Sequence, residues 1–174
     1  MKPIVNILIV VVVSAIFIRL FVLDSFIVKG DSMAPAILAG DYVFINKLAY
    51  NKFVGREPHR AEIIVAEPRG IDKEIIKRVI ALPEERIQFE SGKIVIKNSR
   101  EDSGIELVES YLDLYGTPPI RQTELNIDPF EYFVLGDNRY GSTDSRELGP
   151  IDRWSIKGKV FFVFRIKSLA WKFL

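Results

Sequence analysis

Ser32 lies in a short stretch of turn-forming residues, a few positions after a long apolar segment. The stretch reads Gly-Asp-Ser-Met-Ala-Pro over residues 30–35. A serine hydroxyl can attack a carbonyl carbon when a base removes its proton, and this position would place such a nucleophile at a membrane surface. Glycine, aspartate and serine are also common in turns and at helix N-caps. The stretch alone therefore leaves open whether Ser32 is catalytic, and the answer depends on whether the chain supplies a base.

Lys77 is the side chain best placed to act as that base. A lysine accepts a proton near neutral pH only if burial lowers its pKa from ~10.4 by about 3 units. Lys77 lies within an apolar run typical of a strand, in which Ile75 and Val79 would share its face. Lys47 is the alternative, because it also alternates with apolar residues. It falls at the end of its predicted strand, however, where an exposed lysine is expected.

The only histidine, His59, lies in a polar loop that contains a proline, which favours a surface position. A Ser-His-Asp triad would have to use it, and a site with several histidine ligands is impossible. The absence of cysteine excludes thiolate catalysis and cysteine-based metal sites. Attack by a serine with a lysine base needs no metal or cofactor, and we expect none. The near balance of 24 basic and 23 acidic residues argues against a nucleic-acid partner.

Residues 136–146 form a second group of polar side chains, with two aspartates, two arginines and two serines. Surface ion pairs in a tight turn would explain this composition and would contribute little stability. Alternatively, Asp–Arg pairs could hold a rigid loop in which Ser142 hydrogen-bonds the base.

The apolar segment over residues 4–23 is long enough to cross a bilayer, since about 20 residues at ~1.5 Å each cover ~30 Å. A cleavable secretory signal is the alternative. The segment is longer than a usual signal core, and residues 24–26 offer no small-residue cleavage site. We predict an uncleaved transmembrane anchor over residues 1–23, followed by a catalytic domain over residues 24–174. Lysines flank the segment on both sides, so charge leaves its orientation open.

Beyond the anchor the pattern is that of β-structure. Branched and aromatic runs bounded by Gly and Pro predict strands over 42–45, 62–66, 74–80, 131–135 and 158–166, and a hairpin of 86–89 with 93–97. Residues 98–128 are polar and broken by Gly and Pro, so we expect a surface excursion with at most a short helix near 106–114. The predicted fold is mainly β, a mostly antiparallel sheet or barrel after an N-terminal transmembrane helix.

Four motifs in this order resemble those of bacterial type I signal peptidases, membrane-bound Ser/Lys proteases that remove signal peptides from exported preproteins. They are Gly-x-Ser-Met-x-Pro at 30–35, Gly-Asp-x-Val-x-Ile-Asn-Lys at 40–47, Ile-Lys-Arg-Val-Ile-x-Leu-Pro at 76–83, and Gly-Asp-Asn-Arg-x-x-Ser-x-Asp-Ser-Arg at 136–146. The resemblance covers nearly the whole chain, including the anchor.

The resemblance implies roles for several residues. Ser32 would be the nucleophile, Lys77 the general base, and Ser142 the residue that orients the lysine amine. Asp144 and Arg146 would form an ion pair beside the site. Asp137 and Arg139 would shape the same loop. The Ser32 N–H would donate one hydrogen bond to the oxyanion, and Gly30 offers no side chain for a second.

The resemblance also implies a single-pass protein of the bacterial cytoplasmic membrane, with its catalytic domain on the extracytoplasmic side. Its partners would be membrane lipid and the signal peptides of preproteins, bound as extended strands with small side chains at the first and third positions before the cut. The residues expected to line the pockets for these side chains are Val28, Met33, Ile37, Ile75 and Ile76.

Two departures from the family pattern occur. Ala36 stands where threonine is usual, and Pro83-Glu84-Glu85 replaces Pro-Gly-Asp. A self-cleaving Ser/Lys regulator and an anchored β-domain that binds extended peptides without cutting them are the alternative functions.

Overall fold

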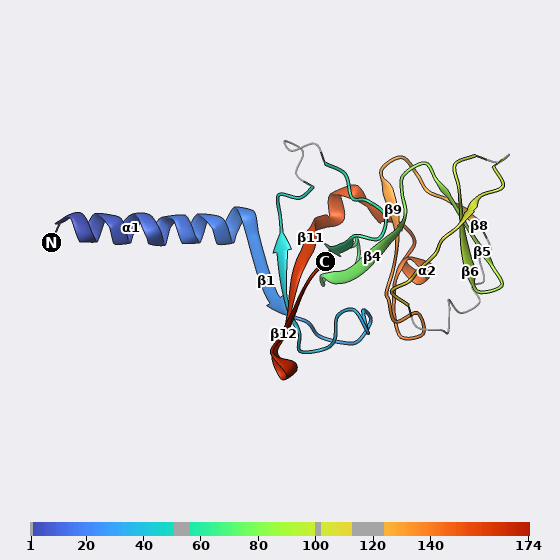
Figure 1. The fold of residues 1–174 in the computed structure, drawn as a ribbon. Helices are drawn as coiled ribbons and strands as arrows, with labels where there is room; N and C mark the ends of the chain where they lie inside the picture. The colour runs from blue at the N-terminus through green and yellow to red at the C-terminus, as the bar shows by residue number, and fades with distance from the viewer. Residues whose placement is uncertain (1, 51–55, 100–101, 113–123) are drawn as a thin grey trace.

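The computed structural model describes residues 2–50, 56–99, 102–112 and 124–174, and Figure 1 shows an apolar helix projecting from a β-rich domain. The helix comprises α1 (Lys2–Phe17) and a π-helical turn, η1 (Ile18–Val22). Its 20 residues from Pro3 to Val22 have a mean hydropathy of 2.8 and are not buried against the domain. The expected apolar helix is therefore present, and by length and composition it can span a membrane.

The strands form two antiparallel sheets, which confirms the predicted fold class. In the first sheet the order is β1-β2-β11-β3-β4-β9-β10, and β12 also pairs with β11. The bounds of these strands are β1 Leu23–Ile27, β2 Tyr42–Asn46, β3 Ile63–Ala66, β4 Ile75–Ala81, β9 Glu131–Leu135, β10 Ile151–Asp152, β11 Ile156–Arg165 and β12 Ala170–Phe173. Short helical turns lie between them: α2 (Ser145–Leu148), η2 (Arg153–Ser155) and η3 (Ile166–Ser168).

The second sheet has the order β7-β6-β5-β8. It is built on the predicted hairpin, β5 (Arg86–Glu90) and β6 (Lys93–Lys97), in which Glu90 pairs with Lys93 across a two-residue turn. Both turn residues, Ser91 and Gly92, have positive φ values of 48° and 83°, as a tight hairpin turn of this kind requires.

Residues 98–128 depart from the expectation of a surface excursion. They contribute β7 (Ile105–Glu106) and β8 (Glu124–Asn126), one on each side of the hairpin, and Ile127 is buried in the core. No helix forms in the described part of the region where a short helix was considered, residues 106–112. Within the described residues of this segment, β7 and β8 are therefore structural parts of the second sheet.

Strand β4 lies where three apolar clusters of the core meet, and all seven of its residues are buried. Ile76 packs in a cluster with Met33, Ile75 and Val79 belong to a second cluster, and Ile80 packs against the second sheet. A lysine in the middle of this strand is therefore enclosed by apolar side chains. Burial of this kind disfavours the charged form of its amine.

Candidate active site

The amine of Lys77 donates a hydrogen bond of 2.9 Å to the hydroxyl oxygen of Ser32. The two residues reach each other from different elements. Lys77 is held in β4, paired with Ile64 of β3. Ser32 lies in the loop between β1 and β2, which Met33 anchors because its side chain is only 1% exposed. The loop is closed by hydrogen bonds between Val28 and both Gly40 and Asp41, each 2.9 Å.

The main chain of Ser32 also contacts the loop over residues 136–146. The Asn138 N–H donates to the Ser32 carbonyl oxygen at 3.0 Å. Gly136 lies against the same oxygen, since a Cβ at Gly136 would be 2.4 Å from it and 2.2 Å from the hydroxyl of Ser142. Only glycine leaves room for this approach.

Burial lowers the pKa of Lys77 from 10.5 to about 8, because the low-dielectric surroundings disfavour the ammonium form. The carboxylate of Asp144 opposes the shift, while Lys73 and Arg146 add to it. The side chain of Lys77 is enclosed, with the whole residue only 4% exposed. The arrangement thus places an amine that loses its proton readily next to a hydroxyl.

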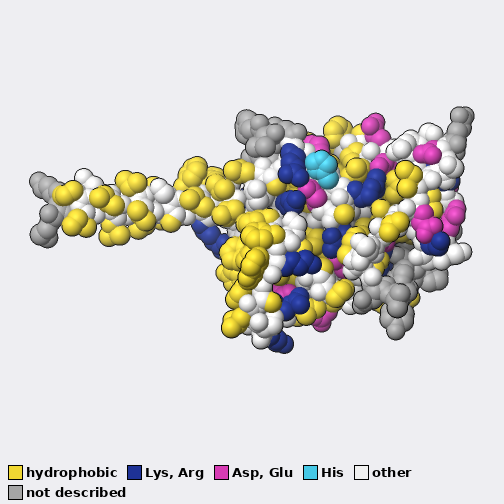
Figure 2. Space-filling model, viewed as in Figure 1, with side chains coloured by type: hydrophobic (Ala, Val, Ile, Leu, Met, Phe, Trp, Pro, Cys, Tyr) yellow, Lys and Arg dark blue, Asp and Glu magenta, His cyan; other side chains and the backbone are white. Residues whose placement is uncertain are grey.

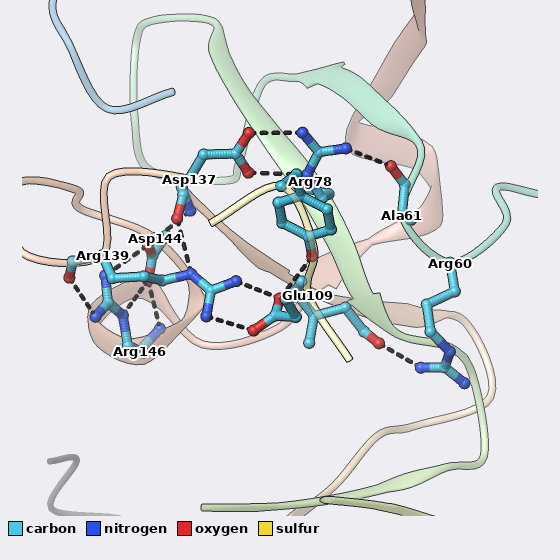
Figure 3. Close-up of polar contacts among 11 residues, drawn as sticks. Arg60, Ala61, Arg78, Glu109, Asp137, Arg139, Asp144 and Arg146 are labelled. Atoms are coloured by element: carbon cyan, nitrogen blue, oxygen red, sulfur yellow. Dashed lines mark hydrogen bonds and ion pairs between the residues drawn. The ribbon is translucent and has the colours of Figure 1, made fainter. Parts of the chain in front are cut away.

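Asp144 and Arg146 form the expected ion pair, with two hydrogen bonds of 2.8 Å between the guanidinium and the carboxylate. Asp144 also accepts the N–H of Gly136 at 2.9 Å, and Arg146 donates to the carbonyl oxygen of Arg139 at 2.6 Å. These bonds join the two ends of the 136–146 loop, and Figure 3 shows Asp144, Arg146 and Arg139 gathered there.

Asp137 and Arg139 have partners outside the loop (Figure 3). The guanidinium of Arg78, the residue after Lys77, donates to both oxygens of Asp137 at 2.8 and 2.6 Å. Arg139 pairs with Glu109, and its Nε donates to the Gly136 carbonyl oxygen at 3.1 Å. Arg78 and Glu109 were not predicted as site residues. The apolar context of Arg78 was a usable signal, because a buried guanidinium requires an acidic partner.

The hydrogen bond expected between Ser142 and the lysine is absent. Within the described part of the chain, the Ser142 hydroxyl is buried and has no hydrogen-bond partner. The two alternative bases lie elsewhere. The His59 side chain is 65% exposed, and its Nδ1 is 3.8 Å from Glu62. The Lys47 amine pairs with Asp24 at 2.9 Å, next to the apolar helix.

A cleft of about 650 Å³ opens beside Ser32 and Lys77. Four of the residues expected to contact substrate line it, namely Val28, Met33, Ile75 and Ile76. The fifth, Ile37, does not, because it is fully buried in the core cluster that contains Val28 and Met33. Charged residues, including Lys73 and Glu74, also line the cleft. Over the described residues, no group of three or more His, Cys, Asp or Glu side chains could hold a metal ion.

Comparison with known proteins identifies the family of this chain. The family model for signal peptidase, peptidase S26, matches residues 1–165. Signal peptidase I of Bacillus caldolyticus is 32% identical over 163 residues, covering 90% of this chain and 87% of that protein. Signal peptidase I of Leptolyngbya laminosa is 33% identical over 162 residues, covering 88% and 74%. A crystal structure of a signal peptidase I from Enterococcus faecalis V583 matches with a TM-score of 0.49 and 28% identity, over 60% of this chain and 97% of that one. The chain therefore belongs to the peptidase S26 family of type I signal peptidases, which are serine proteases.

Proposed function

We propose that this chain removes signal peptides from exported preproteins, with Ser32 as nucleophile and Lys77 as general base. The observation that carries the proposal is the 2.9 Å contact between a buried amine and a hydroxyl at the edge of a cleft. A lysine with a pKa of about 8 is neutral in a useful fraction of molecules near neutral pH. An amine that can be neutral and a hydroxyl within hydrogen-bond distance of it support these two roles.

In the proposed reaction the neutral amine of Lys77 takes the hydroxyl proton as Ser32 Oγ bonds to the scissile carbonyl carbon. The resulting tetrahedral oxyanion collapses, the C–N bond breaks, and Lys77 returns its proton to the leaving amine. A water molecule then attacks the ester on Ser32, again with Lys77 as base, and releases the signal peptide with a free carboxylate. The N–H of Ser32 would stabilise the oxyanion, and Gly30 has no side chain to add a second donor.

Three polar loop residues beside the dyad, Asp144, Arg146 and Ser142, have proposed supporting roles. The ion pair of Asp144 with Arg146 would keep the loop rigid, because its carboxylate also holds Gly136. Ser142, which is not hydrogen-bonded to Lys77 in the structure, would orient the lysine amine during catalysis. Its hydroxyl is buried without a partner among the described residues, a state that costs roughly 1–3 kcal/mol.

The substrate would bind in the cleft as an extended strand. Val28, Met33, Ile75 and Ile76 give its walls apolar surface, which suits small apolar side chains near the cut. Two of these residues precede Lys77 directly in β4, and Met33 follows Ser32. Selection of the substrate and attack on it would therefore depend on the same two segments.

The domain would sit against the outer surface of the bacterial cytoplasmic membrane, held by the apolar helix. Figure 2 shows hydrophobic side chains covering the helix and continuing onto the adjoining part of the domain, over β1 and β12. On β12, Trp171 and Phe173 are 65% and 67% exposed. Exposed aromatic rings of this kind favour the membrane–water interface.

The catalytic assignment is tested with Ser32→Ala and Lys77→Met in the full chain, assayed for processing of a preprotein in detergent. Both variants should lose processing, whereas Ser103→Ala and Lys93→Met, which lie away from the cleft, should retain it. Retained processing in either dyad variant would refute the assignment. A phosphonylating probe should label Ser32, and absence of labelling would favour a domain that binds peptides without cutting them. Cleavage confined to the protein's own chain would favour a self-cleaving regulator.

The membrane contact is tested with Trp171→Ser combined with Phe173→Ser. Substitution is preferable to truncation, because Leu174 packs against the core and its N–H donates to Phe161 at 3.0 Å. Activity should fall on liposomes and stay unchanged in detergent. An equal loss in both would count against a membrane role.

A further inference from the structure

We infer that Glu109 is a positioning residue of the active site, which holds Arg139 and, through it, the loop that packs against Ser32. The inference rests on the proposed roles of Ser32 and Lys77. Glu109 lies in the polar segment over residues 98–128, far along the chain from both dyad residues and outside the four motifs that carry the family resemblance.

The contact between Glu109 and Arg139 is buried and bidentate. One terminal nitrogen of Arg139 donates to Oε2 of Glu109 at 2.8 Å, and the other donates to Oε1. The side chains are only 2% and 9% exposed for Arg139 and Glu109. Two parallel hydrogen bonds in so enclosed a place fix the position of the Arg139 guanidinium.

Arg139 connects Glu109 to the part of the loop that packs against Ser32. Its Nε donates to the Gly136 carbonyl oxygen at 3.1 Å, and its own carbonyl oxygen accepts from Arg146 at 2.6 Å. Gly136 in turn lies against the carbonyl oxygen of Ser32. A shift of Arg139 toward solvent would therefore move the surface on which Ser32 rests.

The same segment also reaches the strand of the base. The hydroxyl of Tyr111 donates to Glu109 Oε1 at 2.5 Å, and the Tyr111 ring lies 3.9 Å from the guanidinium carbon of Arg78. Arg78 follows Lys77 in β4 and binds both oxygens of Asp137. Figure 3 shows this group lying between the loop and the strand. Glu109 thus contacts Arg139 of the loop that packs against Ser32, and Tyr111 contacts Arg78, the residue after Lys77.

A matched control exists in the same segment. Glu106 lies three positions earlier and pairs with Lys93 at 2.9 Å, with side chains 53% and 61% exposed. Exposed pairs of this kind contribute little, and this one faces away from the cleft residues. Loss of charge at Glu106 should therefore leave catalysis unchanged.

The test compares Glu109→Gln and Glu106→Gln with the unmodified full chain, on a fluorogenic signal-peptide substrate in detergent over pH 6 to 10. Glu109→Gln should lower kcat about 10- to 100-fold, the effect of a small misplacement of reacting groups, with KM nearly unchanged. The rise of activity with pH should move to higher pH, because a loosened loop admits water to Lys77. Simple loss of a negative charge would move it to lower pH.

If Glu109→Gln fails to fold, Glu109→Gln combined with Arg139→Gln is measured in its place, since it removes both members of the buried pair. Either folded variant with unchanged kcat and pH profile, or with a profile moved to lower pH, would overturn the inference. Failure of the proposed dyad has a different signature, namely activity retained in Ser32→Ala.

Discussion

Gly136 lies so close to Ser32 that a single added carbon on it would meet the serine's carbonyl oxygen at 2.4 Å. The nearest atoms on the other side are Oγ and Cβ of Ser142, at 2.2 and 2.5 Å from the same point. The main chain of Ser32 thus packs against a residue that has no side chain. The loop over residues 136–146 and the loop that carries Ser32 form one packed unit.

Gly136→Ala should therefore disable the enzyme without abolishing the fold. The added methyl group must displace Ser32 or Ser142, and overpacking of this kind costs about 1–3 kcal/mol of unfolding free energy. We expect kcat/KM to fall by about 100-fold. Urea unfolding and substrate kinetics measure the two effects. Full activity in a folded Gly136→Ala protein would show that the contact does not position Ser32.

Activity should rise with pH through the titration of Lys77. The pKa of the buried amine is about 8, so kcat/KM should increase about tenfold per pH unit below that value and level off above it. Lys73→Gln removes a positive charge that lowers this pKa, and should move the rise to higher pH. Lys93→Gln, on the second sheet, serves as the control. A profile insensitive to Lys73 would contradict this account of the electrostatics.

Lys77→Met should abolish activity while making the protein more stable at neutral pH. Below about pH 8 the amine is protonated in both states, and the folded state bears the desolvation penalty of about 3 kcal/mol. Between about pH 8 and 10.5 the unfolded chain binds more protons than the folded one, so the unfolding free energy rises with pH. Loss of the hydrogen bond to Ser32 in Lys77→Met reduces this gain in unfolding free energy by about 1 kcal/mol.

The measurement for Lys77→Met is denaturant unfolding of both proteins at pH 7 and pH 10. The variant should be more stable by about 2 kcal/mol at pH 7, and its advantage should shrink at pH 10. If the difference in unfolding free energy between the two proteins were the same at pH 7 and pH 10, titration of the buried amine would not be the cause of the variant's greater stability.

Glu84→Gly should stabilise the protein. Glu84 is exposed and has a φ of 65°, a left-handed conformation that costs a non-glycine residue about 1–2 kcal/mol. The greater freedom of glycine in the unfolded chain offsets part of the gain, which leaves up to about 1 kcal/mol. Glu106→Gly, in the extended strand β7, should be destabilising. Thermal unfolding of the two variants would decide, and a lower melting temperature for Glu84→Gly would disprove the strain.

Local patterns in the sequence predicted much of the fold. The apolar helix, the hairpin about Ser91-Gly92 and the runs that become β2, β3, β4, β9 and β11 all carry their periodicity and turn signals within a few residues. Strands β1, β7, β8, β10 and β12 were not predicted. Most are short, and β1, β7, β8 and β10 pair with strands at least eight residues away in the chain, which a local pattern does not encode, whereas β12 pairs with the adjacent β11.

The residues of the candidate site likewise fall into those that the sequence predicted and those that it did not. The apolar context of Lys77 favoured it over Lys47 as the partner of Ser32, and the family resemblance implied the ion pair of Asp144 with Arg146. Glu109 gave no signal, because its partner Arg139 lies 30 residues away and the intervening segment is polar. Ile37 was misplaced because an apolar residue near a nucleophile can equally face the core.

The placement of β11 in the sheet also bears on the order of assembly. This strand, one of the last in the chain, lies between β2 and β3 and hydrogen-bonds to both. The nucleophile loop enters the sheet on the β2 side, and Lys77 lies on the β3 side in β4. A growing polypeptide therefore has both reactive groups long before it has the strand that joins their halves of the sheet. Cleavage competence should therefore arise only after β11 has been synthesised and has paired with both β2 and β3.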